Sequence, residues 1–175
     1  MLIGVISDTH DRLEHMSQAL QYFASESVDL VVHCGDWKNL STVVAFADTA
    51  HALRLPVRGV LGNNDTDVAA FLAAAATVPG DFNLTEGVFE LSLSSNTSLA
   101  AYHGHHKPTL RKVLECPDYS VILLGHSHKP KIEAVDGRLI VNPGSTAFAI
   151  PRSKTWQPSV AIVDTVALTA RLHSW

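Results

Sequence analysis

The sequence has few cysteines, no long apolar segment and no basic leader at its amino terminus. Cys34 and Cys116 are too few for a disulfide framework, so we expect small buried thiols in a reducing compartment. The most apolar stretch, residues 68–78, is shorter than the ~20 residues that a membrane-spanning helix needs. No basic segment precedes the first apolar run, which argues against a signal peptide. These absences predict a cytoplasmic protein without a membrane partner.

The chain also lacks an excess of positive charge. Its 13 lysines and arginines face 17 acidic residues, a formal net charge of −4, which disfavours general binding to nucleic acid and a nuclease activity. A small anionic substrate met by bound cations stays compatible with this charge. The 175 residues, 46% hydrophobic and 17% charged, are typical of one globular domain, which we expect to span residues 1–175.

Polar clusters follow three apolar runs in the first part of the chain. The runs at residues 2–7, 30–34 and 56–61 predict buried strands, and helical spacing of apolar residues predicts helices between and after them. This alternation implies parallel strands joined by right-handed crossovers. Because the carboxyl ends of parallel strands share one edge, we expect the polar side chains that follow them to meet there: Asp8, His10, Asp36 and Asn63.

The second half of the chain contributes imidazoles. Residues 88–93 and 99–102 predict one hairpin, Asp136-Gly137 predicts another, and residues 120–124 predict a further buried strand. Residues 159–164 and 166–172 predict closing strands, so we expect this half to be the more antiparallel one. Its strand ends carry three more candidate ligands: His103, His126 and His128.

The donors at these strand ends are carboxylates, an amide and imidazoles, with no thiolate. Such a set favours Mn, Fe, Ni, Co or Zn in a catalytic role over a closed structural zinc site. It exceeds the needs of one ion, and two ions that share the carboxylate of Asp36 suit phosphoester chemistry. Two divalent ions with Asp8 and Asp36 leave positive charge for a phosphate ester, and a bridging hydroxide is the expected nucleophile.

Five short motifs stand at these strand ends: Asp8-Thr9-His10, Gly35-Asp36, Gly62-Asn63-Asn64-Asp65, His103-Gly104 and Gly125-His126-Ser127-His128. In this order they resemble the signature of the calcineurin-like metallophosphoesterase superfamily. Asn142-Pro143-Gly144-Ser145 and Pro151-Arg152 are similar to its compact bacterial and archaeal branch, the small phosphodiesterases related to Vps29. The resemblance implies an α/β fold, a four-layer αββα sandwich of two mixed β-sheets flanked by helices, with the metal site at the strand ends.

The resemblance also implies a division of the ligands between two divalent ions. One ion takes Asp8, His10, Asp36 and His128, and the other takes Asp36, Asn63, His103 and His126. Manganese is the metal we expect first, with Ni, Fe, Zn and Mg left open. The activity implied is hydrolysis of a phosphodiester, with Asp36 as the shared carboxylate of the catalytic centre.

One position departs from the pattern of many larger family members, which place a histidine directly after the metal-binding asparagine. That position is Asn64 here, and an amide cannot act as a proton donor to the leaving group. His105 or a metal-bound water is the substitute acid we expect. His33 and His105 fit roles beside the ligands or facing the phosphate, and a structural role for either stays open.

Three side chains are candidates for binding substrate: Asn64, Asn142 and Ser145. The alternative for residues 142–145 is a rigid turn that holds the ligand loops. The function we expect is a dinuclear phosphodiesterase that hydrolyses a small phosphoester or a nucleotide. The alternative is a catalytically weak, Vps29-like protein-binding scaffold. Apolar residues such as Trp156 and Trp175 leave association into a homo-oligomer open.

Overall fold

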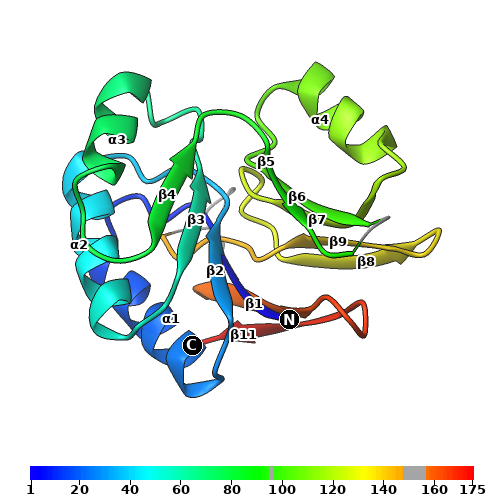
Figure 1. The fold of residues 1–175 in the computed structure, drawn as a ribbon, viewed down its shortest axis with the longest axis horizontal. Coiled ribbons are helices and arrows are strands. Elements are labelled where there is room, and N and C mark those ends of the chain that lie inside the picture. The colour runs from blue at the N-terminus through cyan, green and yellow to red at the C-terminus, as the bar shows by residue number, and fades with distance from the viewer. Residues whose placement is uncertain (95–96, 148–156) are drawn as a thin grey trace.

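The computed structural model describes residues 1–94, 97–147 and 157–175. Three features of the sequence lie outside the described residues: Pro151-Arg152, Trp156 and part of the turn at residues 94–98, between the two strands of the first expected hairpin. Two mixed sheets form the centre of the molecule, as Figure 1 shows. The first has the order β11-β10-β1-β2-β3-β4 and the second the order β5-β6-β7-β9-β8.

The strands of the first sheet are β1 (Leu2–Ile6), β2 (Leu30–His33), β3 (Val57–Val60), β4 (Phe82–Thr85), β10 (Ser159–Asp164) and β11 (Thr169–Ser174). Those of the second are β5 (Phe89–Ser92), β6 (Ser98–Tyr102), β7 (Tyr119–Leu124), β8 (Lys131–Val135) and β9 (Arg138–Asn142). The helices of the described residues are α1 (Leu13–Ser25), α2 (Leu40–Ala52), α3 (Val68–Ala75) and α4 (Lys107–Glu115).

Three apolar clusters separate four layers. The largest lies between the first sheet and helices α1 to α3, and includes Phe23, Trp37 and Phe46, all fully buried. A second cluster joins the facing sides of the two sheets, and a third lies between the second sheet and α4. Figure 1 shows α1 to α3 on one side and α4 on the other. The expected four-layer αββα sandwich of two mixed sheets is confirmed.

The spacing of apolar residues explains why α1 packs as it does. Met16, Leu20 and Phe23 stand three and four residues apart and are buried, so they share one face of the helix. Burying each such side chain stabilises the fold by about 1.5–3 kcal/mol. Leu13 continues the same apolar spacing, but it is the first residue of the helix and is 45% exposed.

The first three strands run parallel, as predicted. Ile6 of β1 pairs with His33 of β2, and His33 pairs with Gly59 of β3. The carboxyl ends of β1, β2 and β3 therefore lie at one edge of the sheet. Backbone hydrogen bonds continue beyond the strands, from Asp8 N to Gly35 O (2.9 Å) and from His10 N to Asp36 O (3.2 Å). The polar clusters after these strands are thus brought together.

One strand of the first sheet differs from the expectation. Strand β4 was not predicted, because Phe82-Asn83-Leu84-Thr85 is short and pairs only with β3, at the edge of its sheet. The second half is the more antiparallel one, as expected. Its hairpin pairs β5–β6, β8–β9 and β10–β11 are antiparallel, and β6–β7 and β7–β9 are parallel. Hairpin signals are local, whereas the crossover through α4 that makes β6 and β7 parallel is not.

No helix among the described residues is long and apolar enough to span a membrane.

Candidate metal centre

Five of the candidate ligands have a left-handed backbone conformation, which is unfavourable for L-residues other than glycine. Asp8, His10, Asp36, His126 and His128 have φ between 39° and 65°. Each left-handed residue that is not glycine costs about 1–2 kcal/mol, and such strain gathers at functional sites. The left-handed residues turn the backbone sharply, so that the side chains point across the edge of the sheet. A backbone that stayed extended would direct them away from that edge. The backbone of the site is therefore strained, and the packing of the two sheets offsets the energetic cost of that strain.

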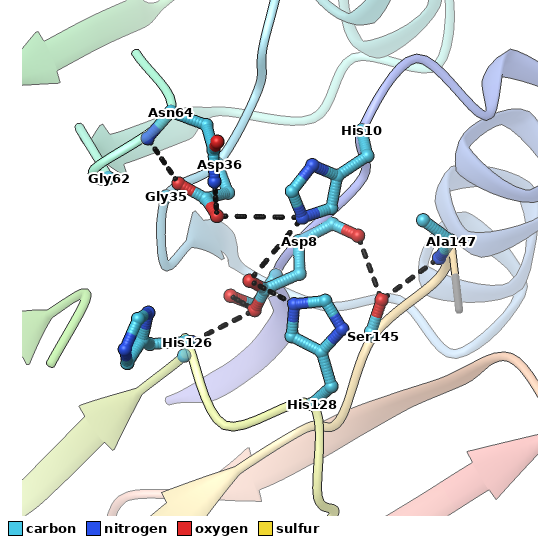
Figure 2. Close-up of polar contacts among 12 residues, drawn as sticks. Asp8, His10, Gly35, Asp36, Gly62, Asn64, His126, His128, Ser145 and Ala147 are labelled. Carbon is cyan, nitrogen blue, oxygen red and sulfur yellow. Dashed lines mark hydrogen bonds and ion pairs between the residues drawn. The ribbon is translucent and has the colours of Figure 1, made fainter. Parts of the chain in front are cut away.

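Four donors form a tight group on the carboxyl ends of β1 and β2 and the loop after β7. Single ligand atoms of Asp8, His10, Asp36 and His128 lie within 4.8 Å of one another (Figure 2). His128 Nε2 is 3.0 Å from Asp8 Oδ1, and His10 Nε2 is 3.5 Å from Asp36 Oδ2. Burial lowers the pKa of His10 more than the two carboxylates raise it, which favours the neutral imidazole that binds metals. These are the residues that the sequence assigns to the first ion.

The carboxylate of Asp8 has one satisfied and one unsatisfied oxygen. Oδ2 accepts hydrogen bonds from Ser7 Oγ (2.5 Å) and from the backbone N–H of His126 (3.0 Å). Oδ1 is buried and faces Nε2 of His128 at 3.0 Å, but it accepts no hydrogen bond from the described residues. A buried carboxylate oxygen left in this way costs free energy unless a cation faces it. The donor set of this group therefore fits a divalent ion.

Asp36 lies between two sets of candidate ligands. Its Oδ2 faces His10, and its Oδ1 is 3.3 Å from Nε2 of His103. Asn64 holds the carboxylate in place, because its backbone N–H donates to Oδ1 (2.9 Å) and its Nδ2 donates to Oδ2 (2.6 Å). Burial raises the pKa of Asp36, but the hydrogen bonds and charge of His103 and the hydrogen bonds from Asn64 outweigh it and hold that pKa well below its usual range.

The second set surrounds His103. Nδ1 of its ring is 2.7 Å from the carbonyl of Cys34 and must donate there, because a carbonyl only accepts. Nε2 of the neutral ring then presents a lone pair to Asn63 Oδ1 (3.1 Å) and Asp36 Oδ1 (3.3 Å). The ring of His126 lies 5.1 Å from that of His103. Three lone pairs facing one another repel unless a proton or a metal ion lies among them.

The pKa of His103 reflects the same contacts. Burial lowers this pKa. The opposite effect is larger and comes from the hydrogen bond and charge of Asp36, the charge of Asp8 and the hydrogen bond to Cys34, so the net shift of the pKa is upward. A proton on Nε2 therefore relieves the repulsion when no metal does. Asn63 and Asp36 thus lie at Nε2 of His103, whereas His126, the remaining residue assigned to the second ion, is exposed and lies near His103 only by its ring.

Asp65 and Gly62 fix the loop around Asp36, a role that the sequence analysis did not assign. Asp65 Oδ2 accepts from the N–H of Gly62 (2.7 Å) and of Asp36 (3.0 Å), and Oδ1 accepts from the N–H of Lys38 (2.7 Å). A Cβ on Gly62 would lie 2.2 Å from Asp36 Oδ1. The only sequence signal was the position of Asp65 at the end of the Gly-Asn-Asn-Asp motif.

His33 is fully buried beneath the loops. Its Nδ1 accepts from the N–H of Gly35 (3.1 Å), so Nε2–H donates to Thr9 Oγ1 (3.2 Å). The ring stacks on Trp37 with centroids 3.6 Å apart. Burial, reinforced by the charge of His103, holds its pKa well below the usual value, so it is a neutral hydrogen-bonding link between two loops.

The candidate substrate residues divide into buried and exposed ones. Asn142 Nδ2 donates to Gly125 O (2.7 Å) and to Ser127 Oγ (3.1 Å), and Ser145 Oγ donates to Asp8 O (2.9 Å). Both side chains are buried and hold the loops that carry ligands, which favours the rigid-turn alternative. Asn64 is exposed beside Asp36.

His105, the candidate acid, is exposed at the rim of the site. Its ring lies 5.5 Å from that of His103 and 6.5 Å from that of His126, measured between centroids. Partial burial and the positive charges of His103 and His126 lower its pKa. It is therefore near the second ligand set without being part of it.

Known proteins share this fold over its whole length. A phosphodiesterase of Methanocaldococcus jannaschii is 29% identical over 165 residues, which cover 94% of this chain and 93% of that protein. The solved structure of an archaeal phosphodiesterase has a TM-score of 0.83 at 27% identity and full coverage of both chains. Vacuolar protein sorting 29 from Cryptosporidium parvum, at 15% identity and a TM-score of 0.65 over 99% of this chain and 97% of its own, shares the fold. The family model of the calcineurin-like phosphoesterase superfamily domain matches residues 1–167, and the chain belongs to that superfamily.

Proposed function

We propose that the protein is a phosphodiesterase with two divalent metal ions, acting on a small phosphoester or a nucleotide. The observation that carries the proposal is the position of Asp36, whose two carboxylate oxygens face His10 at 3.5 Å and His103 at 3.3 Å. One carboxylate between two imidazole sets is the arrangement that a dinuclear phosphoesterase needs. The name of the Methanocaldococcus relative supports the same activity.

The seven candidate ligands would hold the ions in the two groups already described. Asp8, His10, Asp36 and His128 would hold one, and Asp36, Asn63, His103 and His126 the other. Bound divalent ions would offset the negative charge of the phosphoryl oxygens and lower the pKa of a coordinated water. Manganese as the native metal is a prediction from the resemblance to the superfamily, and the donor types are compatible with it.

The protein residues supply position and protons. Asn64 fixes the carboxylate of Asp36 through two hydrogen bonds, so that both oxygens keep their directions. His105, exposed beside His103 and His126, is the imidazole placed to give a proton to a leaving alkoxide. Its lowered pKa makes it a stronger acid when protonated but reduces the protonated fraction at neutral pH.

The scaffold alternative has less support. A protein-binding scaffold has no need for seven metal-type donors, nor for the left-handed backbone that aims five of the residues involved. We further propose that residues 1–175 form one domain, since side chains from both sheets share the cluster between them. A cytoplasmic location and a homo-oligomer stay predictions from the sequence.

The experiment is a turnover assay with Mn, Ni, Mg and Zn on bis(4-nitrophenyl) phosphate, for the wild type and Asp36→Asn. We expect Mn-dependent turnover in the wild type, a loss of at least 100-fold in Asp36→Asn and lower occupancy of both ions by metal analysis. Asp29→Asn, an exposed carboxylate at the opposite end of β2, is the matched control and should keep wild-type turnover. Absence of turnover in the metal-loaded wild type would favour the scaffold.

A further inference from the structure

A groove of about 410 Å³ opens on the outer face of the second sheet, beside α4. We call it the α4 groove and define it by the residues Leu110, Leu114, Leu124, His126, Lys129 and Ile140. Its volume lies in the range of pockets that bind small molecules, roughly 300–1,000 Å³. Apart from His126, these residues have no part in the ligand geometry described so far.

Four apolar side chains form one part of the wall of the groove. Leu110 and Leu114 come from α4, Leu124 ends β7, and Ile140 comes from β9. These four side chains are half-buried and pack at the border of the third apolar cluster. Water against such a surface is displaced favourably by an apolar group of matching size.

The groove is open because of where α4 lies. The helix packs against β6 and β7, and in Figure 1 it stands above them with β9 and β8 farther away. Its carboxyl end is fixed, since Nη1 of Arg138 donates to Leu114 O (2.8 Å) and to Cys116 O (3.3 Å). The wall formed by Leu114 is therefore held in place before any ligand binds.

One end of the groove reaches the candidate metal centre. His126 lines the groove and is also a candidate ligand whose ring lies 5.1 Å from that of His103. Gly104 and Gly125, the residues next to the two candidate ligands, line it as well. A phosphoryl group held by the second ligand set would therefore have a substituent at the mouth of the groove.

The polar residues of the groove suit an anionic ester. Lys129 and Lys131 line it together with one acidic residue, Glu133, which pairs with Lys131 at 2.6 Å. Two positive charges and one negative charge leave a net charge of +1 along this side. The chain as a whole has a charge of −4, so the groove is a locally positive place on an acidic protein.

We propose that the α4 groove is the subsite for an apolar, ring-sized substituent of the phosphoester, so that the preferred substrates are esters of aryl or similarly flat groups. The inference rests on the proposed function of the metal centre. It makes Leu110, Leu114 and Ile140 specificity-determining residues, although none of them touches the reacting atoms.

The test measures binding of phenylphosphonate and methylphosphonate to the Mn-loaded protein by titration calorimetry. Each ligand has one organic group, so the comparison isolates the contribution of that group. We expect phenylphosphonate to bind the wild type at least tenfold more tightly than methylphosphonate. Leu114→Trp, which fills the groove, should reduce this ratio to about twofold or less and leave methylphosphonate binding unchanged.

Two further variants complete the design. Leu110→Gln makes the wall polar without filling it and should also reduce the ratio. Leu72→Trp, on α3 against the other sheet and 36% exposed, is the matched control and should keep the wild-type ratio. Thermal melting and unchanged methylphosphonate affinity show that each variant is folded.

The outcomes separate the two proposals. Equal affinity of the two phosphonates for the wild type, or a preference that Leu114→Trp and Leu110→Gln both leave intact, overturns the subsite. Tight binding of phenylphosphonate that depends on the groove, without turnover of any diester, supports the subsite and contradicts the proposed phosphodiesterase function.

Discussion

Nε2 of His103 lies 3.3 Å from Oδ1 of Asp36, while Nδ1 of the same ring donates to the carbonyl of Cys34. The ring is thus fixed with one nitrogen directed at the carboxylate that the proposed ions share. Without metal, a proton on Nε2 satisfies this contact, and the pKa of His103 is raised accordingly. A metal ion bound by His103 would therefore compete with a proton for the same nitrogen.

This competition makes metal binding dependent on pH. The pKa of His103 in the metal-free protein is raised, so below that pKa the ring carries a proton that a metal must displace. We therefore expect Mn to bind more weakly as the pH falls, by up to about tenfold per pH unit for one displaced proton. Titration calorimetry in two buffers of different ionisation enthalpy should detect proton release. A Kd that is constant from pH 5.5 to 8, with no proton released, would contradict the role of His103.

Gly62→Ala should damage the centre without replacing any candidate ligand. A Cβ at this position would lie 2.2 Å from Asp36 Oδ1 and 2.5 Å from Asp36 N, so the carboxylate must move. We expect a loss of turnover of at least tenfold, weaker Mn binding and a decrease of about 1–3 kcal/mol in the free energy of unfolding. Kinetics, metal analysis and denaturant unfolding measure these effects.

The matched control for this variant is Gly87→Ala, because a Cβ on Gly87 meets nothing within 4 Å. It should keep wild-type turnover and metal content. If Gly62→Ala behaves like Gly87→Ala in all three measurements, the backbone around Asp36 does not set the geometry of the centre.

His105→Asn tests the proposed proton donor. An acid is needed most when the leaving alkoxide is a strong base, so kcat should fall more on alkyl leaving groups than on nitrophenolate, with a difference of about tenfold or more. His106→Asn removes the neighbouring exposed histidine, which bonds Thr109 on α4, and should leave both rates unchanged. Equal losses on both classes of ester in His105→Asn would show that His105 does not act as the acid.

Much of this arrangement could be predicted because it depends on local patterns and one topological rule. Apolar runs identified the strands, and parallel order placed the residues after β1, β2 and β3 at one edge. That rule brought Asp8 and Asp36 together although 28 positions separate them, and Asn64 reaches Asp36 in the same way. The candidate ligands were therefore visible as polar residues that end apolar runs.

Other features depend on distances that only the folded chain defines. In the sequence Asp65 is only the last residue of the Gly-Asn-Asn-Asp motif, but its carboxylate binds three backbone N–H groups from two loops. The sequence left three roles open for His33, beside the ligands, facing the phosphate or structural, and only the fold shows that it is buried and stacks on Trp37. The order of the second sheet and the α4 groove follow from where α4 crosses, and no local residue pattern encodes that position.

The most direct measurement is a crystal structure of the protein grown with manganese, with anomalous scattering recorded to locate the ions. We predict two anomalous peaks about 3.5–4 Å apart, one on each side of the Asp36 carboxylate. Asp8, His10 and His128 should surround one peak and Asn63, His103 and His126 the other. A single peak, or two peaks that do not share Asp36, would contradict the account.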